Sequence, residues 1–232
     1  MLKQKIKNLI KEISYAQPTK INTVPERAYD RALKTSCDYA EKNMIDSLMF
    51  FQPIGIWDYT IELLKSENTK SINCYEFGVF KGRTINYFSK HLPNFKFYGF
   101  DSFIGLQTDW KGWSLTKGTF NLDGIKPKVN TNVVLIDGWF DESIPLFIKQ
   151  NKIDQIQFVH IDSDTYESAE LIFELLGDKM KDGTIILFDE YFGYRGWEIG
   201  EYKAFQEFVS KKNIKYDYLA FSTQQVLVKI IS

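Results

Sequence analysis

The sequence predicts an α/β fold in which seven mostly parallel strands form a doubly wound sheet, preceded by an N-terminal helical cap. From residue 71 onward, short apolar runs alternate with helix-length segments, which is the pattern of parallel strands joined by right-handed crossovers. The chain ends with strand-like runs at 214–220 and 225–230. Because the turn between them is so short, these two strands must pair as an antiparallel hairpin.

The N-terminal part of the chain has helical rather than strand-like patterns. Helices are expected at 30–42 and 56–66, after an amphipathic, lysine-rich run at 2–13 and a linker at 17–25. The apolar face of the run at 2–13 favours packing against the body of the protein or against a second subunit, with a membrane surface as the alternative. We therefore expect that the N-terminal helices can support a homo-oligomer.

The length of the chain suits one large domain with a decoration rather than two full domains. At 232 residues, the chain can bury a substantial core. We assign residues 1–70 to a helical cap or oligomerisation segment and residues 71–232 to a ligand-binding α/β domain.

The composition excludes several classes of protein. A net charge of -1 gives no general attraction for nucleic acid. Cys37 and Cys74 are the only cysteines, so a disulfide framework is not expected. No apolar run approaches the roughly 18 residues that span a bilayer, and the N-terminus lacks the apolar core of a signal peptide. We expect a soluble, cytoplasmic protein without a membrane span.

The first strand of the α/β part leads into a glycine-containing turn. Glu76 lies in this strand, and Gly78 and Gly82 fall where a tight turn feeds a helix at 85–91. This arrangement is typical of a sheet that holds a nucleoside cofactor, although the glycine spacing departs from the dinucleotide fingerprint. The next strand ends in Asp101, about 20 residues beyond Gly82, where an acid can accept both ribose hydroxyls of an adenosine.

Acidic residues also follow the later strands. A run at 132–136 ends in Asp137, and a run at 157–161 ends in Asp162 and, two residues on, Asp164. A further run at 183–188 ends in Asp189 and Glu190. A single acid in such a place is most often a helix N-cap. Acids after all five parallel strands instead favour a ligand site at the carboxyl edge of the sheet.

The segment 102–129 is too irregular for a simple crossover. It is rich in Trp, Gly, Lys and Thr, and includes Trp110 and Trp113. Because long loops in compact domains usually serve a function, we expect this loop to cover the cofactor or the acceptor. The alternative is a surface insertion with its tryptophans packed against the body.

Several segments together resemble the macrocin O-methyltransferase family of bacterial sugar O-methyltransferases, within the class I group that also includes catechol O-methyltransferase. The matching segments are Tyr-Glu-Phe-Gly-Val-Phe-Lys-Gly-Arg at 75–83, Tyr-Gly-Phe-Asp-Ser-Phe-Ile-Gly-Leu at 98–106, Gly-Trp-Phe-Asp-Glu-Ser-Ile-Pro at 138–145, His-Ile-Asp-Ser-Asp-Thr-Tyr-Glu-Ser at 160–168 and Asp-Glu-Tyr at 189–191. The terminal hairpin also belongs to the class I methyltransferase fold. The resemblance implies S-adenosylmethionine as the cofactor and, near Asp162 and Asp189, a Mg²⁺ ion beside the acceptor. This chain carries Glu190 where the family usually has a second Asp.

The expected cofactor site combines the strand-end acids with the residues around them. Glu76 and Asp101 are expected to anchor the donor, Gly78 to let its amino-acid end approach the backbone, and Asp137 to meet the adenine amino group. The full expected set is Glu76, Phe77, Gly78, Gly82, Thr84, Asp101, Ser102, Phe103, Asp137, Gly138, Trp139 and Asp162.

The chemistry of an alcohol acceptor requires a metal, a base or both, because its hydroxyl has a very high pKa. Asp162, Asp189 and Glu190 form an all-oxygen ligand set that suits Mg²⁺ better than zinc. The general base is then Asp162 or Asp164. His91 and His160 are expected to be structural.

Thr165 occupies the position at which catechol-type enzymes have a lysine, which favours a sugar or another aliphatic hydroxyl as the acceptor. The expected partner is therefore a small hydroxylated molecule, such as a natural product, a polysaccharide or a nucleotide-sugar precursor. Two alternatives stay open: a metal-independent N-methyltransferase and a non-catalytic nucleoside-binding protein. A nucleotide-sugar or NAD-linked enzyme is disfavoured by the terminal hairpin and the missing third glycine.

Overall fold

The computed structural model describes residues 23–67, 72–113 and 115–231. The amphipathic run expected at 2–13 lies outside these residues. The helices are α2 (Val24–Asn43), α3 (Pro53–Glu67), α4 (Arg83–His91), α5 (Phe140–Gln150), α6 (Tyr166–Leu176) and α7 (Glu201–Lys212), with short 3₁₀ turns η1 (Gly177–Lys179) and η2 (Trp197–Ile199). The strands are β1 (Leu48–Met49), β2 (Asn73–Phe77), β3 (Lys96–Asp101), β4 (Val133–Asp137), β5 (Phe158–Ile161), β6 (Ile185–Phe188), β7 (Lys215–Phe221) and β8 (Val226–Ile231).

The strands form a single sheet in the order β1-β7-β8-β6-β5-β2-β3-β4. β2 to β6 pair in parallel, and β8 pairs antiparallel with both β6 and β7. The expected parallel sheet with a terminal hairpin is confirmed. The described residues contain one strand more than the seven expected, because two residues before α3, Leu48 and Met49, add to the outer edge of β7. A two-residue pairing leaves no alternation in the sequence from which it could be recognised.

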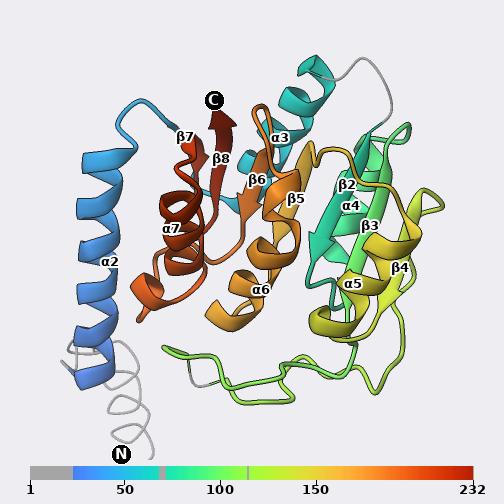
Figure 1. Ribbon diagram of the computed structural model, residues 1–232. Helices are drawn as coiled ribbons and strands as arrows, with labels where there is room; N and C mark the ends of the chain where they lie inside the picture. The colour runs from blue at the N-terminus through green and yellow to red at the C-terminus, as the bar shows by residue number, and fades with distance from the viewer. Residues whose placement is uncertain (1–22, 68–71, 114, 232) are drawn as a thin grey trace, which may run out of the picture.

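Helices cover both faces of the sheet (Figure 1). One core cluster joins the sheet to α5, α6 and α7 through residues such as Phe147, Ile172 and Phe205. The other joins it to α3 and α4 through Ile61 and Phe88. Successive strand residues point to opposite faces, so apolar side chains on both faces of each central strand explain the continuous hydrophobic runs in the sequence. Cys74 is buried in the second cluster, and neither cysteine forms a disulfide.

Helix α2 begins at Val24, earlier than the sequence predicted, because Thr23 is an N-cap. Its side chain accepts a hydrogen bond from the Glu26 backbone, and the Glu26 side chain accepts one from the Thr23 N–H. This capping box stabilises a start inside the segment taken for a linker. Further along the helix, Ser36 Oγ accepts a hydrogen bond from Gly193 N at 2.8 Å. The helix is thereby attached to the loop that follows β6.

Within the part of the chain that the structure describes, no helix has the length and apolarity needed to cross a membrane.

Candidate functional site

A cavity of about 310 Å³ lies where the parallel strands end and is covered by the long loop 102–129. In Figure 1 this loop crosses the end of the sheet and extends toward α2. The cavity is lined by Gly78, Phe80, Asp101, Ser102, Gly105, Leu106, Gln107, Thr108, Trp110, Phe120, Gly138, Trp139, Phe140, Asp162, Ser163, Asp164, Glu167, Ser168, Leu171 and Glu190. This arrangement agrees with the expectation that the loop covers a ligand site.

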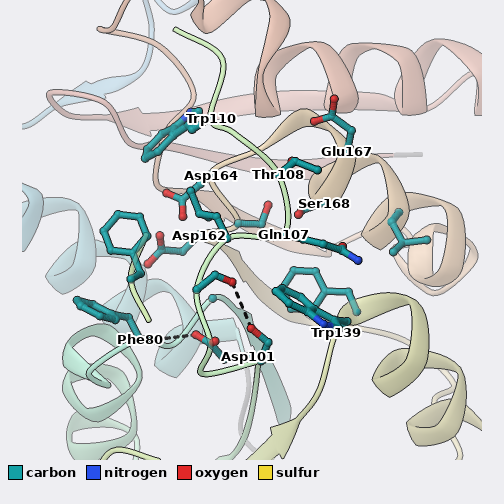
Figure 2. Close-up of a pocket in the computed structure, with 18 of the residues that line it drawn as sticks. Phe80, Asp101, Gln107, Thr108, Trp110, Trp139, Asp162, Asp164, Glu167 and Ser168 are labelled. Atoms are coloured by element: carbon teal, nitrogen blue, oxygen red, sulfur yellow. Dashed lines mark hydrogen bonds between the residues drawn. The ribbon is translucent and has the colours of Figure 1, made fainter. Parts of the chain in front are cut away.

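The cavity has two distinct ends. In Figure 2, Asp101 and Trp139 lie at one end and Trp110 lies at the other, with Asp162 and Asp164 between them. The end at Asp101 is formed by the turns that follow β2, β3 and β4, whereas the other end is formed by the loop 102–129 and by the residues that follow β5 and β6. A ligand that fills the cavity therefore passes the carboxylates at its middle.

The turn after β2 depends on Gly78, whose φ is +94°. A Cβ at this position would lie 1.7 Å from the backbone oxygen of Asp162. The turn is further fixed by Gly78 N, which donates to Phe100 O, and by Asp162 N, which donates to Phe77 O, both at 2.9 Å. Glycine is therefore required by the close approach of two strand ends, in addition to any contact with a cofactor.

Asp101 connects two turns through its carboxylate. Its Oδ2 accepts hydrogen bonds from Val79 N at 2.8 Å and Phe80 N at 2.7 Å. Its Oδ1 accepts one from Phe103 N at 2.7 Å. Asp101 also lines the cavity. Because a carboxylate offers about four lone-pair sites, it retains acceptor capacity for a ligand.

The structure brings some expected cofactor residues to the cavity wall and places others elsewhere. Those on the wall are Gly78, Asp101, Ser102, Gly138, Trp139 and Asp162. Those that do not line it are Glu76, Phe77, Gly82, Thr84, Phe103 and Asp137. Phe77 and Phe103 are instead packed in the core. Gly82 caps α4 with a left-handed backbone. Asp137 forms a half-exposed ion pair with Lys126 at 3.2 Å.

Glu76 belongs to a buried row of polar side chains beneath the cavity. His160 Nδ1 lies 3.1 Å from Glu76 Oε2, and His160 Nε2 lies 3.6 Å from Asp189 Oδ1. Burial opposes the charged form of His160, but the two carboxylates raise its pKa well above the ordinary value. Burial raises the pKa of Glu76. The pairing of β2 with β5 places Glu76 directly opposite His160, so this row is a consequence of strand register.

The carboxylates of Asp162, Asp164 and Glu190 meet between the two ends of the cavity. One oxygen of each lies within 4.8 Å of the others, and Asp189 makes a second such group with His160 and Asp162. Burial raises the pKa of Asp162, Asp164 and Glu190 well above ordinary values, and neighbouring carboxylates add to the effect. The sequence-predicted catalytic residues Asp162 and Asp164 are thus brought together with the predicted ligand Glu190. The predicted ligand Asp189 instead groups with His160 and Asp162 and lies behind the cavity wall rather than on it.

These carboxylates fit a hard divalent cation. The ligand atoms of Asp162, Asp164 and Glu190 are all oxygens, which is the set that Mg²⁺ prefers, whereas the second group adds a nitrogen of His160. Glu190 Oε2 is buried and has no hydrogen-bond partner among the described residues. A cation there would relieve both the repulsion between the carboxylates and the unsatisfied oxygen.

Glu201, the first residue of α7, is a member of this acidic region that sequence reasoning missed. Its Oε1 accepts hydrogen bonds from Ser163 N at 3.0 Å and Ser163 Oγ at 3.2 Å. Its Oε2 accepts one from Glu190 N at 3.4 Å. It therefore joins the segments after β5 and β6 and fixes the carboxylates that they carry. An acid in the first turn of a helix is common, so the sequence alone offered no signal for this role.

Comparison with known proteins agrees with the geometry. A family described as a methyltransferase domain matches residues 75–191. The chain belongs to this methyltransferase family. The match includes the end of β2, all of β3 to β6, and every strand-end acid described above. No curated protein is similar in sequence at a significant level.

Solved methyltransferase structures share the fold. The O-methyltransferase NovP is 16% identical over 77% of this chain and 79% of its own, with a TM-score of 0.59. The calicheamicin methyltransferase CalS11 is 19% identical over 90% of this chain and 94% of its own, with a TM-score of 0.60. An apo structure of CalS11, titled a TDP-rhamnose 3'-O-methyltransferase, is 20% identical over 90% and 96%, with a TM-score of 0.53.

The protein is therefore a methyltransferase that depends on S-adenosylmethionine and has the class I, Rossmann-like fold. In this methyltransferase, the cavity at the carboxyl edge of the sheet is the place where open parallel sheets bind their ligands.

Proposed function

We propose that this methyltransferase transfers a methyl group to a hydroxyl of a sugar or a similar small hydroxylated acceptor, and that it uses Mg²⁺. The observation that carries this proposal is the group of carboxylates of Asp162, Asp164 and Glu190 in the middle of the cavity. An amine acceptor needs no such group, whereas an alcohol needs its pKa lowered before it can react.

In the proposed arrangement, the donor occupies the end of the cavity at Asp101. Asp101 accepts a hydrogen bond from a ribose hydroxyl, and Trp139 and Gly138 line the space for the adenosine. Asp137, which forms an ion pair with Lys126 at the next strand end, is proposed to meet the adenine amino group. Gly78 and Gly82 shape the turn, and Glu76, Phe77, Thr84 and Phe103 support it from behind the wall.

The transfer itself is an in-line displacement. The bond between the acceptor oxygen and the methyl carbon forms while the bond between that carbon and the donor sulfur breaks, and the hydroxyl proton passes to Asp164 or Asp162. Asp162 and Glu190 would hold the Mg²⁺ ion beside Asp164, with Asp189 contributing its charge from behind the wall, and the ion would lower the pKa of a nearby hydroxyl. Alignment of the two substrates can supply roughly 7 to 11 kcal/mol of the rate enhancement.

A sugar is favoured over a catechol by the residue that follows Asp164. Thr165 caps α6, where its side chain accepts a hydrogen bond from Ser168 N, and it cannot act as the lysine base of catechol-type enzymes. CalS11, which shares the fold, is titled a methyltransferase of TDP-rhamnose, and this supports a sugar acceptor here.

The test is methyl transfer from labelled S-adenosylmethionine to a panel of nucleotide-linked sugars and glycan fragments, with excess Mg²⁺ or excess chelator. We expect transfer in Mg²⁺ and its loss in chelator. Mg²⁺ at about 100 times its Kd should also stabilise the fold by about 2.7 kcal/mol, measured as a rise in Tm that Asp162→Asn abolishes and Glu190→Gln reduces. Equal transfer to a sugar in chelator and in Mg²⁺ would refute the metal and leave Asp162 or Asp164 as an unaided base, whereas transfer to an amine that survives chelation would favour an N-methyltransferase. Donor binding without transfer to any acceptor would favour a nucleoside-binding protein.

A further inference from the structure

A second cavity, of about 350 Å³, lies next to the methyl-transfer cavity. Three segments that are distant in sequence form it: the first turns of α2, the loop 102–129 and the loop after β6. Its lining residues are Val24, Pro25, Ala28, Tyr29, Gly112, Trp113, Tyr194 and Arg195. Nothing in the chemistry proposed above uses this cavity.

A partition of aromatic rings separates the two cavities. Trp110 lines the methyl-transfer cavity, and its ring centroid lies 5.7 Å from that of Trp113 and 6.0 Å from that of Tyr194. Trp113 and Tyr194, which line the second cavity, are stacked with centroids 6.0 Å apart. The cavities are therefore one aromatic layer apart.

The partition contains buried polar atoms that are not fully satisfied. Trp110 Nε1 and Tyr194 OH are buried and interact with each other, but neither atom makes a hydrogen bond of good geometry with a described residue. Such atoms are uncommon in folded proteins and indicate a missing partner. Because an indole N–H is only a donor, a sugar or phosphate oxygen at the partition would give Trp110 Nε1 a better-aligned acceptor than the Tyr194 hydroxyl.

The charges of the two cavities are opposite. The lining of the methyl-transfer cavity carries the carboxylates of Asp101, Asp162, Asp164, Glu167 and Glu190 and no basic side chain. The single charged side chain in the lining of the second cavity is that of Arg195. A negatively charged group would be repelled from the first cavity and attracted to the second. The acceptor should therefore place a neutral ring at the carboxylates and an anionic group near Arg195.

The walls of the second cavity also suit a flat ring. Trp113 is 39% exposed and Tyr29 is 48% exposed, so each presents part of an aromatic surface on which a planar ligand can stack. Arg195 Nε donates to Gly112 O at 3.1 Å, which fixes the guanidinium at the cavity while its other N–H groups remain suited to a phosphate.

We propose that the second cavity binds the nucleoside diphosphate part of a nucleotide-linked sugar, whose sugar occupies the methyl-transfer cavity. The base stacks against Trp113 and Tyr29, and the diphosphate contacts Arg195 and crosses the partition near Trp110. This inference rests on the proposed function because it identifies the carrier of the acceptor. An aromatic carboxylate on a natural product has the same combination of flat ring and negative charge, and the test below separates the two sources.

The test is calorimetric titration of the full-length protein with TDP, in the presence of saturating S-adenosylhomocysteine to fill the donor site. We expect TDP to bind, and Arg195→Gln and Trp113→Ala each to weaken its binding at least tenfold. Because Arg195 also holds the loop through Gly112, Tyr29→Ala is added as a variant that leaves this contact intact, and it should weaken binding several-fold. The matched control is Arg31→Gln, which removes the same charge from an exposed position on α2 outside the cavity, and it should leave binding unchanged.

Each other outcome overturns the proposal. Absence of TDP binding, or binding that none of the three cavity variants weakens, refutes a nucleotide site in this cavity. Binding of 4-hydroxybenzoate without binding of TDP would assign the cavity to an aromatic acid instead. Equal weakening by Arg31→Gln would show that general charge, rather than the cavity, attracts TDP. Titration with S-adenosylmethionine alone reports on the methyltransferase function separately, so failure of one proposal is distinguishable from failure of the other.

Discussion

Two clusters of polar side chains in this protein, both at least partly buried, satisfy their polar groups to different degrees. On one side of the sheet, the hydroxyl of Tyr218 lies 2.5 Å from that of Tyr39 and 2.6 Å from that of Tyr191. Gln206 Nε2 donates to Tyr191 at 3.1 Å and to Tyr216 at 2.9 Å. We call these five residues the tyrosine cluster. Its groups are neutral and satisfy one another.

The carboxylates at the cavity are the contrasting case. Asp162, Asp164 and Glu190 carry like charges within 4.8 Å, and one oxygen of Glu190 has no partner among the described residues. A cluster that satisfies itself stabilises a fold, whereas one that is left under-satisfied indicates a site completed by a ligand. We therefore expect the two clusters to respond differently to the loss of a single polar group.

The largest expected effect is on turnover at the carboxylates. Asp162→Asn and Asp189→Asn should each lower kcat by about 100-fold or more, since each removes a charge proposed to hold the metal. Donor affinity, measured by titration, should stay within a few-fold. Glu190→Gln should cost less, because its longer side chain departs from the family pattern. Full turnover in Asp162→Asn would contradict the proposal that the carboxylates, unlike the tyrosine cluster, form a catalytic site.

The next effect concerns the donor end of the cavity. Asp101→Ala should weaken S-adenosylmethionine binding by about 10- to 100-fold, because it removes charge-assisted hydrogen bonds worth about 1.5 to 3 kcal/mol. The substitution also removes the acceptor of three backbone N–H groups, which can destabilise the fold. A melting curve must therefore accompany the titration. Asp101→Asn, which keeps the acceptor oxygen, is the matched control and should lose less affinity. Unchanged donor affinity in Asp101→Ala would restrict its role to joining the two turns.

The tyrosine cluster should show the opposite response. Tyr218→Phe leaves Tyr39 and Tyr191 without their shared partner, so it should lower the free energy of unfolding by about 1 to 3 kcal/mol. Denaturant titration measures this loss, and kcat should be unchanged. A large fall in kcat without a fall in stability would show that the tyrosine cluster takes part in catalysis.

The smallest effect is a pH dependence of stability at Glu201. Burial raises the pKa of Glu201 to about 7. Between the ordinary value near 4.5 and this one, the folded state binds more protons than the unfolded state, so stability falls as pH rises through that range. In metal-free protein, Tm should be lower at pH 7.5 than at pH 5.5, and Glu201→Gln should reduce the difference. An identical pH dependence in the variant would mean that other carboxylates account for it.

The sequence predicted the sheet because its strands are buried on both faces and read as continuous apolar runs. It also predicted the acids at the strand ends, including Asp162 and Asp164, since parallel strands place their carboxyl ends at one edge. It did not predict β1, whose two residues carry no pattern, or the early start of α2, where the capping box of Thr23 and Glu26 extends the helix into a polar segment.

By itself, the sequence determined the class of fold, the methyltransferase family and the identity of the carboxylates, because these depend on local patterns and on the order of strands. The tertiary structure fixed which of the expected residues line the methyl-transfer cavity together. Strand register paired Glu76 with His160 behind the cavity, and the packing of α7 brought Glu201 to Ser163. Contact between the loop 102–129 and the loop after β6 formed a second cavity from residues that no spacing connects. Such contacts join positions far apart in the chain, and their geometry is fixed only when the whole core packs.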